Sequence, residues 1–270
     1  MEKSTLRQRL DAGEVAYGVI TAWPDPDLVE AAGRCGFDWL FIDAEHGALD
    51  IRTCVELVRA ADCAGMTSLV RVPYGDVRGV YPYLDLGAHG LIFPHIRTAA
   101  DAQEVVHACL FPKEGLRGAM SSSRAARYGV VYNSPSDYFR AANTAVWVFP
   151  MIEDVEAVES LNDILGTPGI HAYFVGPGDL ALSRLVPRTT EAPPIEALVD
   201  RAIATGVRQG KVVATVAATP EAAASLVDKG VRMIGVGATG LFTSACRRYL
   251  DAVPRKPRVP PATHGSSPAR

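Results

Sequence analysis

The sequence predicts a single-domain (β/α)8 TIM barrel, and three observations support this. Short apolar runs, typical of strands buried in a parallel sheet, alternate eight times with segments of helical periodicity along the 270 residues. Several of these runs end abruptly in ionisable side chains, as strands do at the carboxyl end of a barrel. The hydrophobic fraction of 48% and the charged fraction of 21% suit a soluble globular protein with a sizeable core. A doubly wound sheet with two miscounted strands is the alternative.

The chain divides in order into pairs of one strand and one helix. We expect strands at 15–22, 37–46, 68–72, 91–93, 145–152, 171–175, 212–216 and 233–236. We expect helices at 25–35, 51–64, 77–86, 99–109, 155–165, 195–208, 221–229 and 241–252. Pro73 stops the third strand, and Gly87 closes the helix that follows it. This alternation assigns residues 1–252 to one barrel domain.

Two segments fall outside this alternation. Residues 111–138 form a long insertion rich in Gly, Ser and Arg, and loops of this length are usually functional or disordered. Residues 253–270 are rich in Pro, Ser and Arg and offer nothing to bury, so we predict a disordered C-terminal tail.

Composition and charge restrict the classes of partner. The formal net charge of -3 indicates no nucleic-acid partner and no anionic membrane partner. No apolar run reaches transmembrane length, and the first residues are too polar for a signal peptide, so we expect a cytoplasmic protein. The five cysteines have no CxxC spacing, and we expect reduced, buried thiols rather than disulfides or metal ligands.

Ionisable side chains stand where the predicted strands end, and in a barrel these ends share one rim. In chain order they are Asp43, Glu45, His46, Arg71, His95, Glu153 and Asp179. A single carboxylate after a strand is commonly a helix cap, and Asp154 or Glu153 could cap the helix near Val155. A single histidine is more often a hydrogen-bonded structural residue than a ligand. All of them together on one rim indicate chemistry, because burying unpaired charges is costly.

The two well-separated carboxylates, Glu153 and Asp179, suggest a hard divalent cation with oxygen ligands. The absence of cysteine ligands and clustered histidines argues against structural zinc. Gly176 and Gly178 would let backbone amides approach an anionic group such as a substrate carboxylate. A simple turn before a capped helix is the other interpretation of this segment.

Residues 235–240, GVGATG, match the pattern G-x-G-x-x-G after a strand and before a helix. A dinucleotide site would need a further strand and an acidic residue about 20 positions on, and neither follows. We therefore interpret the segment as a tight turn, with space for an anion at the helix N-terminus.

Six segments together resemble one known family. They are DWLFIDAEH, VRVP, LDLGAHGLIFPHIRTAADA, FPKEGLRGAMSSSRAARYG, MIED and FVGPGDLALS. In this order they are similar to the HpcH/HpaI aldolases, metal-dependent (class II) pyruvate aldolases. The similarity extends from about Val15 to about Leu250.

This resemblance implies a barrel, commonly assembled into a hexamer, that reversibly cleaves a 4-hydroxy-2-oxo acid to pyruvate and an aldehyde through a metal-stabilised enolate. It implies that Glu153 and Asp179 hold Mg2+, Mn2+ or Co2+. It also implies that backbone amides around Gly178 and Asp179 receive the pyruvate carboxylate, and that Arg71 contacts the ketone oxygen.

The resemblance further implies that His46 is the acid/base group, supported by Asp43 and Asp85. Histidine side chains titrate near neutral pH, which suits removal of the proton from the 4-hydroxyl group. The cation and Arg71 would stabilise the negative charge that develops on the ketone side.

Three positions depart from the family pattern. Many members have glutamine where this chain has Met151, and many have aspartate where it has Ala238 or Thr239. The small residue before the metal-binding aspartate is usually alanine, and here it is Gly178. These departures bear on the identity of the substrate more than on the class of reaction.

Retro-aldol cleavage needs an electron sink, either a protonated imine on lysine or a Lewis-acid metal. The lysines are Lys3, Lys113, Lys211, Lys229 and Lys256. Lys211 begins a strand and would lie at the wrong end of the barrel, and Lys229 ends a helix. Only Lys113, in the long insertion, could reach the pocket, so the metal route is favoured.

The insertion also supplies basic side chains, Arg117, Arg124 and Arg127. They could recognise a distal acid group of the substrate, or make subunit contacts or a solvated face. Other interpretations of the whole chain are a CoA-thioester lyase of the citrate or malyl-CoA lyase type, a relative that uses the same enolate for decarboxylation or condensation, and a non-catalytic barrel that binds a 2-oxo acid.

Overall fold

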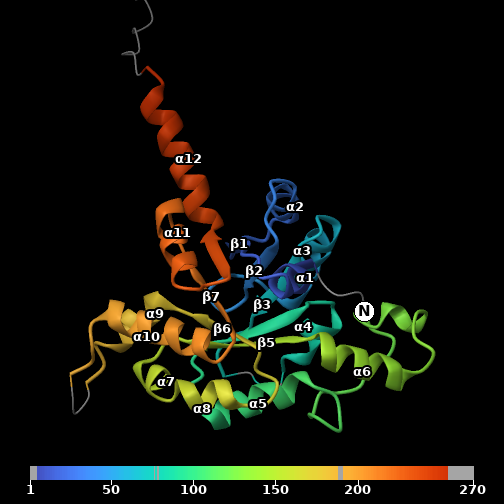
Figure 1. Ribbon diagram of the computed structural model, residues 1–270. Helices are drawn as coiled ribbons and strands as arrows, with labels where there is room; N and C mark the ends of the chain where they lie inside the picture. Colours follow the sequence, from blue (N-terminus) through green and yellow to red (C-terminus); the bar gives the residue numbers. More distant parts are fainter. Residues whose placement is uncertain (1–4, 76, 78, 188–190, 255–270) are drawn as a thin grey trace, which may run out of the picture.

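The computed structural model describes residues 5–75, 77, 79–187 and 191–254 (Figure 1). The strands close into a barrel in which every neighbouring pair is parallel, and β1 (Ala16–Thr21) pairs with β8 (Met233–Gly237). The other strands are β2 (Trp39–Asp43), β3 (Thr67–Arg71), β4 (Gly90–Phe93), β5 (Trp147–Ile152), β6 (Ala172–Val175) and β7 (Val212–Val216). The predicted (β/α)8 barrel is confirmed, and closure excludes the doubly wound sheet.

Helices alternate with the strands around this barrel (Figure 1). They are α1 (Thr5–Asp11), α2 (Pro26–Arg34), α3 (Ile51–Cys63), α4 (Tyr81–Asp85), α5 (Ala99–Cys109), η1 (Arg127–Gly129), α6 (Pro135–Ala145), α7 (Val155–Glu159), α8 (Leu161–Gly166), α9 (Pro177–Ser183), α10 (Ile195–Arg208), α11 (Pro220–Asp228) and α12 (Ala238–Ala252). No helix of the described residues is long and apolar enough to cross a membrane.

Side chains on the strands alternate between the barrel interior and the helical layer, because successive residues of a strand point to opposite faces. The interior cluster includes Trp39, Phe41, Leu69, Phe149 and Met151. The amphipathic helix α1 adds Leu6 and Leu10 to this cluster, and Arg232 before β8 donates to the Leu10 carbonyl at 2.7 Å. Helix α1 therefore closes the amino end of the barrel and leaves the carboxyl rim for chemistry.

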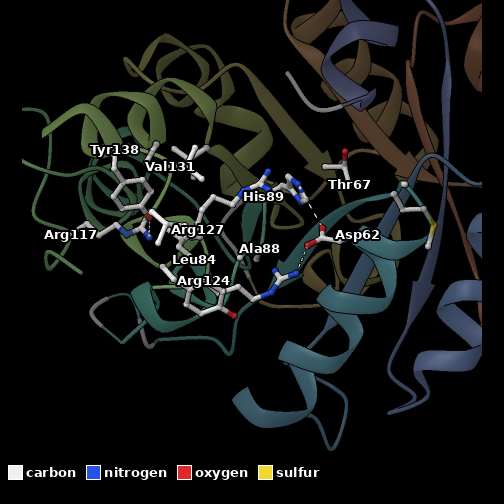
Figure 2. A pocket seen from close by; sticks show the side chains of 18 residues that line it. Asp62, Thr67, Leu84, Ala88, His89, Arg117, Arg124, Arg127, Val131 and Tyr138 are labelled. Atoms are coloured by element: carbon white, nitrogen blue, oxygen red, sulfur yellow. Dashed lines mark hydrogen bonds and ion pairs between the residues drawn. The ribbon is translucent and has the colours of Figure 1, made fainter. Parts of the chain in front are cut away.

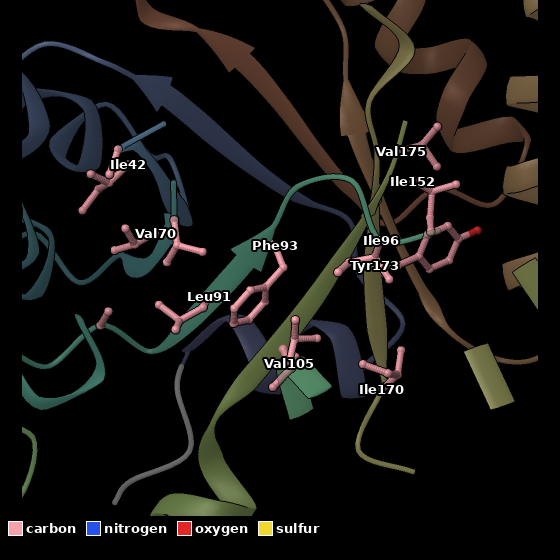
Figure 3. Close-up of a cluster of buried hydrophobic side chains, with 14 of the residues drawn as sticks. Ile42, Val70, Leu91, Phe93, Ile96, Val105, Ile152, Ile170, Tyr173 and Val175 are labelled. Atoms are coloured by element: carbon pink, nitrogen blue, oxygen red, sulfur yellow. The ribbon is translucent and has the colours of Figure 1, made fainter. Parts of the chain in front are cut away.

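The opposite set of strand residues packs against the helices. Ile42, Val70 and Leu91 lie on neighbouring strands in one cluster with Val105 of α5, and all are buried (Figure 3). Burying an aliphatic side chain of this size contributes about 1.5–3 kcal/mol relative to exposure. The strands are thus apolar on both faces, as the continuous apolar runs of the sequence predict.

Several elements differ from expectation. Helix α1 and the short helix α9 were not predicted, and α6 lies partly inside the expected insertion. Ser160 separates α7 from α8, where one helix was expected. The segment GVGATG does not form a tight turn: β8 continues to Gly237, and α12 begins at Ala238. In the predicted tail, residues 255–270 lie outside the described residues.

Helix α12 projects away from the barrel, and Figure 1 shows most of its length without a neighbour. Only Ala238 is buried in it, whereas Phe242, Tyr249 and Leu250 are 57%, 69% and 48% exposed. A helix with exposed apolar side chains at this spacing is amphipathic. Among the described residues the ring of Phe242 meets Trp23 edge-on, with centroids 5.8 Å apart, but Tyr249 and Leu250 stay exposed.

Candidate active site at the carboxyl rim

Asp43 and Arg71 form a buried ion pair at the rim. The register of β2 and β3 places Asp43 beside Arg71, and alternation from Phe41 and Leu69 points both side chains into the barrel. Arg71 donates to both carboxylate oxygens, from Nε at 3.0 Å and from Nη2 at 2.6 Å. Both residues are 7% exposed, so this two-point contact fixes the guanidinium.

The pKa values keep this pair charged. Burial alone would raise the pKa of Asp43, but Arg71 and the backbone N–H groups of His46 and Glu45 outweigh it and lower the pKa. Burial alone would lower the pKa of Arg71, but hydrogen bonding to Asp43 and the nearby Glu45 raise it. Arg71 is therefore a permanent cation at the rim, available to an anionic or developing negative group.

Glu45 and His46 follow on the turn after β2. Glu45 Oε2 lies 3.3 Å from Arg71 Nη1 and 3.9 Å from His46 Nε2. The Glu45 side chain is 11% exposed and the His46 side chain is 64% exposed. The imidazole thus stands at the open side of a buried charged cluster, where an incoming molecule can reach it.

Glu153 is the most deeply buried charged residue of the rim, with 1% exposure. Interior-facing Phe149 and Met151 precede it by four and two positions, so it extends the same inward row. Its Oε1 accepts from the backbone N–H of His95 at 2.9 Å, whereas Oε2 is buried without a hydrogen-bond partner. Burial raises the pKa of Glu153 to about 7, and the negative charge of Asp179 adds to this increase.

Gly176 makes room for this carboxylate at the end of β6. A Cβ there would lie 2.9 Å from Glu153 Oε2 and 2.9 Å from Met151 Cε. Asp179 lies in the first turn of α9, just after Gly178, and is part-buried. The charge of Asp179 contributes to the raised pKa of Glu153, so the two carboxylates interact electrostatically. No group of three or more His, Cys, Asp or Glu suited to a metal occurs in the part of the chain that the structure describes.

A second network, centred on the buried Asp154, borders the rim and was not predicted from the sequence. His95 has a positive φ of 55°, and its Nδ1 lies 3.0 Å from Asp154 Oδ2. Arg97 also contacts Asp154, with Nε at 3.1 Å from Oδ2. Asp154 occupies the N-cap position of α7 but makes no side-chain cap, so the suggested capping role is wrong. A cavity of about 600 Å³ lies beside His95, with Tyr74 packed edge-on against the imidazole.

The remaining predicted residues lie elsewhere. Asp85 ends α4, and its carboxylate accepts from Arg117 Nη2 at 2.7 Å. No hydrogen bond or ion pair joins Asp85 to His46 among the described residues. Met151 reaches the rim, where its Sδ lies 3.9 Å from Arg71 Nη1, a weak sulfur contact.

The long insertion connects α5 to β5 and therefore lies at the amino end of the barrel. This location separates Lys113 and the insertion arginines from the rim of their own chain. Lys211 lies before β7 and donates to the Ile170 carbonyl at 2.6 Å, at the amino end as expected.

The comparisons with known proteins decide the family. The model of the HpcH/HpaI aldolase/citrate lyase family matches residues 18–245. This chain belongs to the HpcH/HpaI aldolase/citrate lyase family. The resemblance inferred from the sequence is thereby confirmed, and the chain is an enzyme of the lyase class.

Named relatives of this family cover nearly the whole chain. A 5-keto-4-deoxy-D-glucarate aldolase from Klebsiella pneumoniae is 30% identical over 244 residues, 90% of this chain and 94% of that protein. A hydroxypyruvate/pyruvate aldolase from Cupriavidus necator is 30% identical over 262 residues, 96% of each protein. The solved structure of a family protein from Burkholderia cenocepacia is 34% identical with a TM-score of 0.83, covering 92% of this chain and 98% of that one.

Proposed function

We propose that this chain is a divalent-metal-dependent (class II) pyruvate aldolase that cleaves a 4-hydroxy-2-oxo acid to pyruvate and an aldehyde. The observation that supports this most directly is the buried, unpartnered Oε2 of Glu153 on the same rim as the charged guanidinium of Arg71. An uncompensated buried carboxylate oxygen is costly unless a cation or a donor satisfies it. A 2-oxo acid offers negative oxygens to both the cation and Arg71.

Glu153 and Asp179 would hold Mg2+, Mn2+ or Co2+. Two carboxylates suit a hard cation with oxygen ligands and leave positions for water and a chelating substrate. When bound, the cation would supply Lewis acidity to the ketone of the substrate. Gly176 supports this assignment, because a side chain there would occupy the space at Glu153 Oε2.

Side chains and backbone amides of the protein would stabilise charge, transfer the proton and bind the substrate carboxylate. Arg71, oriented by Asp43, would donate hydrogen bonds to the ketone oxygen as negative charge develops. His46 would remove the proton of the 4-hydroxyl group, while the bond between C3 and C4 breaks and its electron pair moves to the pyruvate half. Backbone amides at Gly178 and Asp179 would receive the substrate carboxylate at the first turn of α9.

The proposal is tested by pyruvate release from 4-hydroxy-2-oxo acids. We expect activity to disappear after dialysis against a chelator and to return with Mn2+ or Mg2+. Activity that is indifferent to chelation would overturn the metal assignment. Cleavage that requires CoA would assign the chain to the lyase branch of its family instead.

We also propose a homo-oligomer, such as a hexamer, in which Asp85 acts on His46 of a second copy. The exposed apolar face of α12 supports association, and Asp85 has no contact with His46 within the described part of one chain. A cytoplasmic location is proposed because all five cysteines are free, with Cys54 and Cys109 buried as thiols.

A further inference from the structure

A second cavity lies at the amino end of the barrel. Its volume is about 850 Å³, and its floor includes Thr67 at the start of β3, His89 just before β4 and Val146 just before β5 (Figure 2). The proposed active-site residues stand at the other ends of the same strands. The cavity is therefore separate from the rim of its own chain, although Arg117 in its lining pairs with Asp85, the residue proposed to act on a second copy.

One wall presents hydrogen-bond donors around a single carboxylate. Arg124 Nη2 lies 2.6 Å from Asp62 Oδ2, and His89 Nε2 lies 4.0 Å from Asp62 Oδ1 (Figure 2). The backbone N–H of Ser68 donates to His89 Nδ1 at 3.2 Å. This acceptor role assigns the proton of a neutral imidazole to Nε2, so His89 directs an N–H toward Asp62 and the cavity.

Two further arginines line the cavity, and one of them, Arg127, exceeds the available negative charge. Arg117 is 5% exposed and pairs with Asp85, but its buried Nε has no hydrogen-bond partner. The guanidinium of Arg127 has no partner among the residues that the structure describes. The lining thus holds three arginines against the one carboxylate of Asp62, with Asp85 behind Arg117.

The backbone at Arg127 has an unusual conformation. Arg127 and Tyr128 have φ values of 52° and 57°, which L side chains rarely adopt. This conformation sits in the segment that lines the cavity, and such outliers commonly occur at ligand clamps. Arg127 is exposed, so its charge costs nothing in desolvation before a ligand arrives.

Apolar and aromatic side chains also line the cavity. They include Leu84, Ala88, Val131 and Tyr138, and Arg117 lies beside Tyr138, with Nη2 3.4 Å from the hydroxyl oxygen (Figure 2). A cavity lined by both cationic and apolar side chains suits a molecule with both characters. We propose that this cavity binds an organic anion, a phosphate monoester or a carboxylate that carries an apolar group.

The test is calorimetric titration of the full chain with phenyl phosphate and with benzoate. We expect saturable binding of at least one anion and no binding of phenol. The anion that binds more tightly shows whether the cavity prefers a phosphate monoester or a carboxylate. Arg127→Gln should weaken binding about tenfold or more, because a charge-assisted contact is lost. Val131→Asp, at an exposed apolar position of the lining, should abolish binding by placing a negative charge in the cavity.

Arg52→Gln is the matched control, because Arg52 is exposed on α3, the helix that carries Asp62, but does not line the cavity. We expect the Arg52→Gln variant to bind the anion with the same affinity as the unmodified chain. Absence of binding to both anions, equal binding of phenol, or equal losses in Arg52→Gln and Arg127→Gln would each overturn the proposal. Binding that Arg127→Gln and Val131→Asp leave unchanged would do the same, since the anion would then bind elsewhere.

Discussion

Glu153 carries two oxygens in different environments: Oε1 accepts from the backbone of His95, and Oε2 is buried without a partner. Burial is the main cause that raises its pKa from 4.5 to about 7. A carboxyl group with a raised pKa binds its proton more tightly in the folded chain than in the unfolded chain. Folding stability therefore falls as the pH rises from about 4.5 to 7, where the unfolded state has already lost that proton.

We expect this effect to appear in the metal-free protein and to vanish in Glu153→Gln, which cannot titrate. Between pH 5 and pH 8 the free energy of unfolding of the unmodified chain should fall by about 3 kcal/mol more than that of the variant. Urea denaturation in the presence of a chelator measures the difference. Added Mg2+ should restore the stability of the unmodified chain at pH 8, and parallel pH curves for the two proteins would contradict the prediction.

His46 has the opposite character, because its side chain is 64% exposed beside the buried Glu45. Its replacement should disturb packing little and chemistry strongly. We expect His46→Ala to lower turnover by roughly 10² or more, with an unfolding midpoint close to that of the unmodified chain. His107→Ala on α5 is the control, and near-normal turnover of His46→Ala would remove this residue from the mechanism.

At the scale of single elements, strand alternation decides which residues reach the rim. Apolar runs that end in charged residues predicted the strand boundaries within about three residues. They also identified Asp43, Arg71 and Glu153, because these side chains continue the alternation of inward-facing residues to or past the end of each strand. The sequence did not predict the network of His95 and Asp154. That network depends on a positive φ and on a contact between residues 59 positions apart, which no local pattern encodes.

Helices were predicted less well than strands where tertiary packing stabilises them. Helix α1 has only 7 residues and forms because Leu6 and Leu10 close the barrel, not because of its own propensity. Helix α9 likewise has 7 residues, and it begins at the proline of a Gly-Pro pair that equally suits a turn. The family resemblance suggested a catalytic role for Asp85. Its ion pair with Arg117 depends on tertiary packing and could be recognised only in the folded structure.

The end of β6 offers a test of the space around Glu153. Gly176→Ala would place a Cβ 2.9 Å from Glu153 Oε2, closer than Cβ atoms normally approach other atoms. We expect the carboxylate to move, and the affinity for Mn2+ to fall tenfold or more, on the scale of changes next to metal ligands. Metal titration by calorimetry measures this effect. Gly166→Ala is the control, because a Cβ there meets nothing within 4 Å, and equal affinities in both variants would contradict the prediction.

At the scale of the whole molecule, the barrel separates two sites along the same strands. The rim gathers Asp43, Arg71 and Glu153 at the carboxyl ends of β2, β3 and β5, whereas the insertion between α5 and β5 builds the cavity at the amino ends. Helix α1 closes the interior between them. Within one chain, β3, β4 and β5 connect the cavity to the rim, because each has one end near either site.

Helix α12 leaves the molecule incomplete as a single chain. Phe242 and Tyr249 lie on one side of the helix, and Ser244 lies on the other, at 100° per residue. An exposed apolar helix face favours association with another chain. A second copy of this chain can cover the face in a symmetric contact. Tyr249→Asp should therefore shift the protein toward a smaller assembly, measured by light scattering after gel filtration.

Ser244→Asp adds the same charge to the opposite face of α12 and should keep the assembly intact. If Asp85 acts on His46 of a second copy, dissociation by Tyr249→Asp should also lower turnover, although Tyr249 lies about three helical turns beyond the end of β8. Turnover should then rise with protein concentration as the assembly re-forms. Equal assembly size for the two variants would exclude the apolar face of α12 as the contact, because the charge on that face would have changed nothing.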